Sequence, residues 1–122
     1  MYWDIYIMMK HTILILFLFL SLLCHGQSYK FFTTDRELSS SLINKIYQDR
    51  NGMIWIATED GLNRYDGAKF ITYKHDPENE YSLCHNYVRV LYEDSKGRLF
   101  VGTYNGIQLY DPETDSFSAR AQ

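Results

Sequence analysis

The sequence predicts an all-β fold of four-stranded antiparallel meanders in tandem, preceded by a helical export signal. The main observation is a pattern of glycine turns and apolar runs that recurs 45 residues later in the chain. These runs are short and rich in Ile, Val, Tyr, Phe and Trp, which favours strands over helices. A separate apolar run near the N-terminus has the length of a signal sequence.

The first two dozen residues have the pattern of a secretory signal peptide. Lys10 precedes an apolar run from Ile13 to Cys24. A run of about a dozen residues fits a signal sequence and falls short of the roughly 20 that span a bilayer. We therefore predict a signal peptide over residues 1–26, with Met8 or Met9 as alternative starts and a retained membrane anchor as the alternative to cleavage.

The composition excludes several classes of protein. The chain of 122 residues has a net charge of −3 and no basic field, which argues against a nucleic-acid partner. Cys84 is the single cysteine outside the leader, so no internal disulfide can form. Stability must therefore come from the packing of strands.

The repeat is gapless between its two copies. Eight residues recur identically at the 45-residue offset, namely Leu38, Tyr47, Asp49, Gly52, Thr58, Gly61, Tyr65 and Asp66. Asn-Gly and Asp-Gly pairs separate the apolar runs of the first copy, as in hairpin turns that need positive φ. The first copy predicts strands over Ile43–Gln48, Met53–Thr58, Leu62–Asp66 and Lys69–Lys74. The second copy predicts strands over Tyr87–Glu93, Arg98–Thr103, Ile107–Tyr110 and Ser116–Ala119.

The second strand of each copy indicates how the sheets are arranged. Residues 54–57 and 99–102 are apolar or small on both faces instead of alternating with polar residues. Such a strand must be covered on both sides, as when one sheet is stacked between two similar sheets. This arrangement is that of blades in a β-propeller, whose repeats have about this length. The third strand, residues 62–65, does not alternate cleanly, and we expect a β-bulge there.

The order of residues within each copy resembles a known family, the two-component regulator propeller repeat. The resemblance runs over Ile43 to Asp66 and again over Val88 to Asp111, and it is carried by Ile54-Trp55-Ile56, Thr58 and Gly61-Leu62-Asn63-Arg64-Tyr65-Asp66. It implies seven-bladed propellers in the periplasmic sensor region of a hybrid two-component histidine kinase. It also implies an oligosaccharide ligand, no cofactor, and a parent protein that is a homodimer in the inner membrane with its kinase domain outside this chain.

The resemblance divides the chain into four parts. The signal peptide comes first, and residues 27–37 resemble a fourth strand that is expected to close the ring at its last blade. Residues 38–81 form the first blade, and residues 82–122 form a truncated second blade. Because about three repeats are the minimum for a stable array, we expect an N-terminal fragment of a longer sensor.

Candidate ligand residues lie where the two copies differ although the strands around them do not. The turn between the second and third strands is acidic in the first copy and Tyr-Asn in the second. The connector over residues 75–86 is expected at the same end of the blades, because four antiparallel strands bring those turns together. The predicted ligand face therefore consists of Glu59, Asp60, Tyr104, Asn105 and Asn86.

No catalytic residue is predicted. Asp49 and Asp94 stand at equivalent places before turn glycines, which is typical of turn-capping acceptors. Asp66 and Asp111 also stand at equivalent places in the two copies, and we interpret them in the same way. Trp55 is predicted to be a core residue rather than a sugar-stacking platform, because its repeat partner is also aromatic. A secreted propeller enzyme or lectin acting on polysaccharide, and a module that serves only dimer contacts, remain the alternatives.

No metal site is predicted either. His75, Cys84 and His85 lack the close spacing of metal ligands, and no fourth ligand is evident. We interpret them as solvated connector residues.

Overall fold

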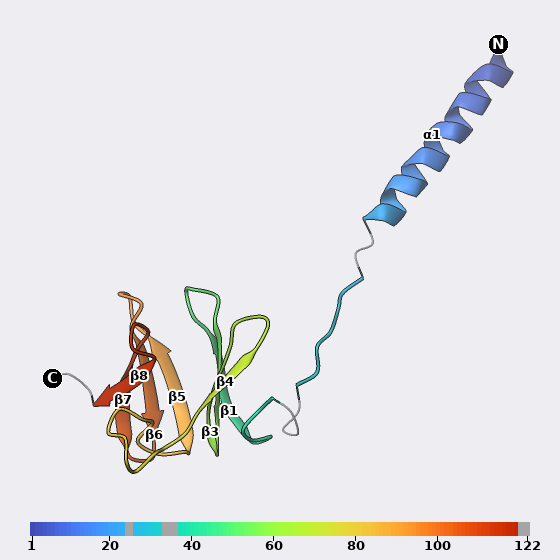
Figure 1. The fold of residues 1–122 in the computed structure, drawn as a ribbon. Coiled ribbons are helices and arrows are strands. Elements are labelled where there is room, and N and C mark those ends of the chain that lie inside the picture. The colour runs from blue at the N-terminus through green and yellow to red at the C-terminus, as the bar shows by residue number, and fades with distance from the viewer. Residues whose placement is uncertain (24–25, 33–36, 120–122) are drawn as a thin grey trace. The chain divides into compact units, whose positions relative to one another are not determined.

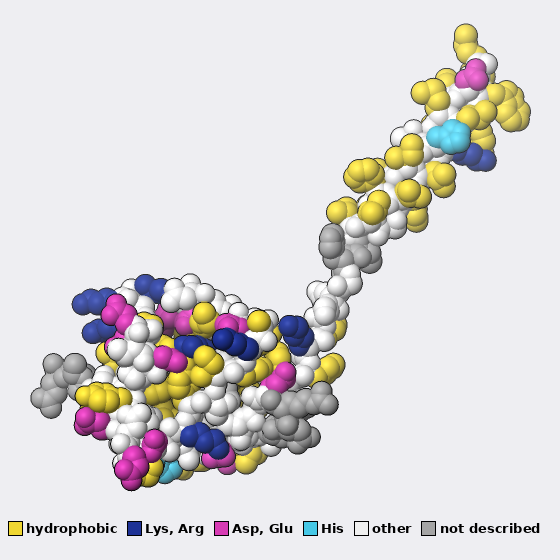
Figure 2. Space-filling model, in the orientation of Figure 1, with side chains coloured by type: hydrophobic (Ala, Val, Ile, Leu, Met, Phe, Trp, Pro, Cys, Tyr) yellow, Lys and Arg dark blue, Asp and Glu magenta, His cyan; other side chains and the backbone are white. Residues whose placement is uncertain are grey.

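The computed structural model describes residues 1–23, 26–32 and 37–119, in two units that divide between Phe31 and Phe32. In the first unit, α1 covers Tyr2–Leu22 and has a mean hydropathy of 2.0 over its most apolar window. It is long and apolar enough to cross a membrane, and Figure 2 shows hydrophobic side chains along its visible length. An apolar helix at this position is consistent with the predicted signal peptide.

The second unit consists of two four-stranded antiparallel meanders (Figure 1). The first sheet is formed by β1 (Ile43–Gln48), β2 (Ile54–Thr58), β3 (Gly61–Tyr65) and β4 (Phe70–Tyr73). The second is formed by β5 (Val88–Glu93), β6 (Leu99–Thr103), β7 (Gly106–Asp111) and β8 (Ser116–Ala119). In both sheets the spatial order follows the chain order. The all-β prediction is confirmed, and every predicted strand lies within one residue of its observed bounds at each end. We call the two sheets blade 1 and blade 2.

The first turn of each blade is held by its aspartate. In blade 1 the Asp49 carboxylate accepts the backbone N–H groups of Asn51 at 2.9 Å and Met53 at 3.0 Å. In blade 2 the Asp94 carboxylate accepts those of Lys96 and Arg98 at 3.0 and 2.9 Å. The hydrogen bond from the Arg98 backbone is the main reason that the pKa of Asp94 lies below its usual value. The predicted turn-capping role is therefore confirmed, and it leaves these carboxylates engaged with backbone.

The core lies between the two blades. Its buried side chains come from blade 1, from the connector and from blade 2, and they are Trp55, Ala57, Leu62, Leu83, Val88, Leu91, Leu99, Val101, Tyr110 and Phe117. In β2 both faces are buried, as the sequence predicts. In β6 the side chains of Leu99 and Val101 are buried, whereas Phe100 on the opposite face is only half-buried. The first blade is therefore covered by the second, and the second has one open face.

The bulge expected in the third strand is absent, and the prediction was wrong about its place. Pairing between β2 and β3 runs in continuous register. The shifts in register occur instead in β1, between Ile43 and Lys45, and at the equivalent place in β5. The alternation of apolar and polar residues fails in β3 because the polar residue Asn63 is fully buried. Its amide oxygen accepts the backbone N–H of Ser39 at 3.2 Å, and its amide nitrogen donates to the Ser39 hydroxyl at 2.8 Å. A buried polar residue can thus imitate a bulge in the sequence pattern.

The predicted closing strand is only partly described. Residues 27–32 form no strand, and residues 33–36 lie outside the described part of the chain. The ring of Phe32 contacts the rings of Tyr65 at 4.9 Å and Phe70 at 4.8 Å between centroids. Phe32 therefore packs on blade 1, and closure of a ring by this segment stays a prediction.

Candidate ligand-binding end of the blades

The turns predicted to bind ligand lie at one end of the two blades. The backbone N–H of Gly61, in the β2–β3 turn, donates to the carbonyl of Asn86 in the connector at 2.6 Å. The backbone N–H of Tyr104, in the β6–β7 turn, donates to the carbonyl of Tyr87 at 3.3 Å. These bonds join both turns to the end of the connector, whereas the β1–β2 and β5–β6 turns lie at the opposite end (Figure 1).

Two of the five predicted residues converge on Tyr87, just before β5. The Tyr87 hydroxyl donates to the carboxylate of Glu59 at 3.0 Å, from blade 2 to blade 1. The ring of Tyr104 packs on the ring of Tyr87 with 4.4 Å between centroids. The Glu59 carboxylate that accepts this hydrogen bond is the main cause of the raised pKa of Tyr87, because ionisation would place two negative charges side by side. The result is a tyrosine pair at the junction of the blades, with the Tyr104 side chain largely exposed.

Two further residues complete this cluster. The ring of His85 meets Tyr104 edge-on at 5.8 Å, and the guanidinium of Arg89 lies 5.5 Å from the centre of the same ring. We call Glu59, His85, Tyr87, Arg89 and Tyr104 the aromatic cluster. Sequence reasoning missed His85, Tyr87 and Arg89 as members. A signal was available, since the first copy has Ser40, Leu42 and Asn44 at the equivalent positions.

The other three predicted residues make contacts that shape the loops. Asp60 forms an ion pair with Lys74 at 2.9 Å, between the β2–β3 turn and the end of β4. The Asn86 side chain accepts the backbone N–H of His75 at 2.7 Å, across the connector. Asn105 donates to the carbonyl of Cys84 at 3.3 Å. These side chains hold the loops in place and lie around the aromatic cluster rather than in it.

The candidate metal ligands of the connector are separately engaged. Nδ1 of His75 lies 2.8 Å from the carbonyl oxygen of Leu83, and Nδ1 of His85 accepts the backbone N–H of Tyr87 at 2.9 Å. The thiol of Cys84 lies 3.0 Å from the hydroxyl of Thr103. His85 and Cys84 are half-buried rather than solvated, which corrects the sequence interpretation. Within the described residues, no group of three or more His, Cys, Asp and Glu side chains is placed to hold a metal ion.

A second polar cluster ties the blades together near the β7–β8 turn. The Asp115 carboxylate accepts the hydroxyls of Tyr73 at 2.5 Å and Tyr110 at 2.7 Å, and it pairs with Arg64 at 3.1 Å. We call these four residues the inter-blade cluster. Desolvation alone would raise the pKa of Asp115, yet the two hydroxyls and the guanidinium bring it below its usual value. Burial, followed by the bond to Asp115, raises the pKa of Tyr73 well above its usual range.

The Arg64 guanidinium also lies over Trp55, at 5.6 Å from the ring centre. The inter-blade cluster therefore closes the core at its edge, and its geometry indicates a structural role.

Two sheets of four meandering strands, stacked face to face and related by a 45-residue repeat, define the chain as consecutive blades of a β-propeller. The described blades match solved propeller domains of sensor proteins. The extracellular domain of a hybrid two-component system of B. thetaiotaomicron is 34% identical with a TM-score of 0.65, over 74% of this chain and 13% of that domain. The extracellular domain of a one-component system from the same organism is 25% identical with a TM-score of 0.60, over 75% of this chain and 13% of that domain.

The sequence comparisons identify the repeat itself. Residues 37–60 and 82–105 match the model of the two-component regulator propeller. A histidine kinase of Formosa agariphila is 41% identical over a 73-residue alignment, and the match covers 57% of this chain and 5% of that kinase. Two segments of the chain therefore match the two-component regulator propeller repeat, and the chain spans a small part of the length of these relatives.

Proposed function

We propose that these blades belong to a periplasmic ligand-sensing propeller of a hybrid two-component histidine kinase, that they respond to oligosaccharides, and that they contribute binding rather than catalysis. The similarity to extracellular domains of two-component sensors and the apolar N-terminal helix support export. Ligand would favour one arrangement of the propellers and so bias a kinase elsewhere in the parent protein. Such a bias requires that the ligand binds the two arrangements with different affinities.

The observation that carries this proposal is the aromatic cluster. It lies at the junction of two blades, and its residues come from the turns, the connector and the start of β5 and differ between the two copies of the repeat. Tyr104 is 59% exposed, and an exposed aromatic side chain is a surface on which the C–H face of a pyranose ring can pack. The Glu59 carboxylate, which accepts from the Tyr87 hydroxyl, can accept from sugar hydroxyls, and the Arg89 guanidinium over the Tyr104 ring can donate to them.

The test measures binding of a panel of neutral and uronic-acid oligosaccharides to the full-length protein by isothermal titration calorimetry. We expect Tyr104→Ala to weaken binding about fivefold or more, since stacking on an aromatic ring contributes on the order of 1 kcal/mol. Its control is Tyr92→Ala, which removes an exposed tyrosine of β5 outside the aromatic cluster. Equal loss of affinity in both variants, or none in either, would contradict the assignment. A dimer that forms without any soluble ligand would favour the module for dimer contacts.

A further inference from the structure

Arg89, the second residue of β5, is a cation with no acidic partner among the described residues. Arg50, Arg64 and Arg98 each pair with a carboxylate. The Arg89 side chain is exposed, and within the described part of the chain its guanidinium makes no ion pair or hydrogen bond. It does contact Tyr104, whose ring centre lies 5.5 Å away. The N–H donors of a permanent positive charge are therefore available to a ligand.

The carboxylates of the β2–β3 turn are already engaged. The Glu59 carboxylate accepts the Tyr87 hydroxyl at 3.0 Å, and Asp60 pairs with Lys74 at 2.9 Å. Neither carboxylate forms an ion pair with Arg89. Arg89 is thus an exposed arginine whose charge the described fold does not use for its own contacts, and such an arginine is suited to recognise an anionic group.

His85 supplies a second donor near the same aromatic ring. Its Nδ1 accepts the backbone N–H of Tyr87 at 2.9 Å, so the neutral imidazole carries its hydrogen on Nε2. The imidazole meets the Tyr104 ring edge-on, with 5.8 Å between ring centres. The donors of Arg89 and His85 therefore lie close to one exposed aromatic side chain. This combination fits a sugar ring that carries an oxyanion.

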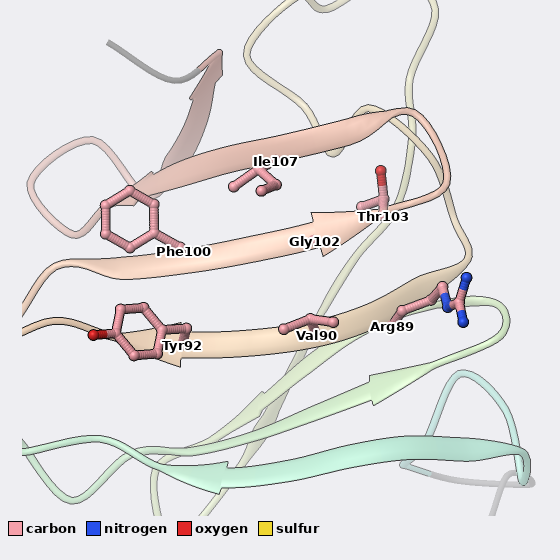
Figure 3. A pocket seen from close by; sticks show the side chains of 7 residues that line it. All are labelled: Arg89, Val90, Tyr92, Phe100, Gly102, Thr103 and Ile107. Carbon is pink, nitrogen blue, oxygen red and sulfur yellow. The ribbon is translucent and has the colours of Figure 1, made fainter. Parts of the chain in front are cut away.

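Arg89 lies at the edge of the outer face of blade 2, where this face meets the ligand-binding turns. Figure 3 shows Tyr92 and Phe100 at one end of the face, and Arg89 with Thr103 at the other end. Thr103 is the last residue of β6, directly before the β6–β7 turn. The guanidinium points away from Val90 in the middle of the sheet (Figure 3). Its position is therefore that of a turn residue rather than of a residue that packs between sheets.

The junction of blades 1 and 2 shows that a neighbouring blade leaves this position accessible. Blade 2 covers the face of blade 1, yet Asn44, the equivalent of Arg89, stays exposed. Glu59, the equivalent of Tyr104, is only half-buried there. The Asn44 side chain donates to the Val88 carbonyl of blade 2 at 2.8 Å. A guanidinium has more donors than an amide, so Arg89 can make such a contact and still bind a ligand.

We propose that the ligand of the aromatic cluster is an acidic oligosaccharide, whose carboxylate or sulfate group binds Arg89 while a sugar ring packs on Tyr104. This inference rests on the proposed function and adds the chemical class of the ligand. The planar fork of a guanidinium matches both oxyanions, and two parallel N–H···O bonds fix the orientation of the sugar. The net charge of −3 makes the chain as a whole repel an anion, so the attraction comes from this local arrangement.

Matched pairs of oligosaccharides test the inference on the full-length protein by isothermal titration calorimetry. A panel of uronic-acid oligosaccharides is paired with the carboxyl-reduced, neutral forms, and a panel of sulfated oligosaccharides is paired with the desulfated forms. We expect an acidic member to bind at least about tenfold more tightly than its neutral form, as for a hydrogen-bonded charge pair. The panel that shows the difference identifies the acidic group as a carboxylate or a sulfate.

Arg89→Gln removes the charge and keeps a polar side chain. We expect it to reduce the preference for the acidic member to about twofold or less and to leave binding of the neutral form almost unchanged, because the ion pair supplies the preference. Lys96→Gln is the matched control, since it removes one exposed cation from the β5–β6 turn at the opposite end of the same blade. An equal loss of preference in the two variants, or none in Arg89→Gln, overturns the proposal.

The same titrations separate this inference from the proposed function. If neutral forms bind as tightly as acidic forms and Tyr104→Ala weakens both, the acidic class of ligand is wrong and the sugar site stands. If no oligosaccharide of either kind binds, the proposed function and this inference both fail. A preference that Arg89→Gln removes and Lys96→Gln keeps supports both.

Discussion

Replacement of Trp55 by alanine tests the interface between the blades most sharply. The indole is 1% exposed and packs against the rings of Tyr73, at 5.9 Å, and Tyr110, at 4.7 Å between ring centres. Its N–H donates to the Asp49 carboxylate at 2.8 Å, so it also ties the core to the first turn. Alanine would remove these ring contacts and this hydrogen bond together.

The expected cost follows from this burial. A fully buried Trp replaced by Ala loses about 3–5 kcal/mol of folding stability, from lost transfer free energy and from the cavity left behind. Trp55→Phe keeps most of the apolar contact and loses the hydrogen bond, which corresponds to about 1–2 kcal/mol. Phe100→Ala is the matched control, because Phe100 is the repeat equivalent of Trp55 and is only half-buried. In the 122-residue chain it should cost about 1 kcal/mol.

Urea unfolding followed by far-UV circular dichroism measures all three variants, since the signal does not depend on the indole that is removed. We expect the stabilities to fall in the order Phe100→Ala, Trp55→Phe, Trp55→Ala, with the last lowest. If Trp55→Ala fails to fold, the Trp55→Phe value still tests the reasoning. Equal stability of Trp55→Ala and Phe100→Ala would refute the placement of Trp55 in the core.

Three further predictions concern single positions. Asp115→Asn should make the Tm fall less steeply on acidification. The pKa of Asp115 in the folded state lies below its ordinary 3.8, so the stability that the carboxylate confers is lost as the pH falls from that value through the folded pKa. A Tm-versus-pH series that stays parallel to wild type would contradict this. Gly61→Ala should destabilise the fold more than Gly106→Ala. Both glycines have φ near +120°, which costs an alanine about 1–3 kcal/mol, but only at Gly61 would the methyl group also lie 2.9 Å from a β4 carbonyl oxygen. Equal losses of folding stability in urea would show that this contact does not matter. Cys84→Ser should change stability by less than about 0.5 kcal/mol, because Ser39 makes the equivalent hydroxyl contact in the first copy; a drop in Tm of several degrees would show that sulfur packing matters.

The strands were predictable because the turn residues within each copy and the 45-residue repeat indicate the same strand positions. Glycine dipeptides mark the hairpins, and each apolar run of blade 1 recurs in blade 2 at a constant offset. The fully apolar second strand correctly indicated cover on both faces. The misplaced bulge shows the limit of this approach. Periodicity cannot distinguish an extra residue from a buried Asn63 whose side chain is hydrogen-bonded within the fold.

The candidate site was predicted less completely. Strand connectivity places the two variable turns and the connector at one end of the blades. Glu59 and Tyr104 were found because they occupy equivalent positions and differ between the copies. Tyr87 was missed because its role depends on the close approach of two blades, which brings its hydroxyl to Glu59 across the junction. Arg89 was missed because only the fold shows that its guanidinium lies over the Tyr104 ring. Contacts between blades are set by tertiary packing and leave no pattern in a single strand.

Hydrogen exchange of the full-length protein, with and without an oligosaccharide from the panel that binds, tests the central claim most directly. The account predicts slower exchange in the β2–β3 and β6–β7 turns and at the start of β5, where the aromatic cluster lies. The β1–β2 and β5–β6 turns at the opposite end of the blades should exchange as before. Protection confined to that opposite end, or no change at either end while ligand is bound, would contradict the assignment of the binding surface.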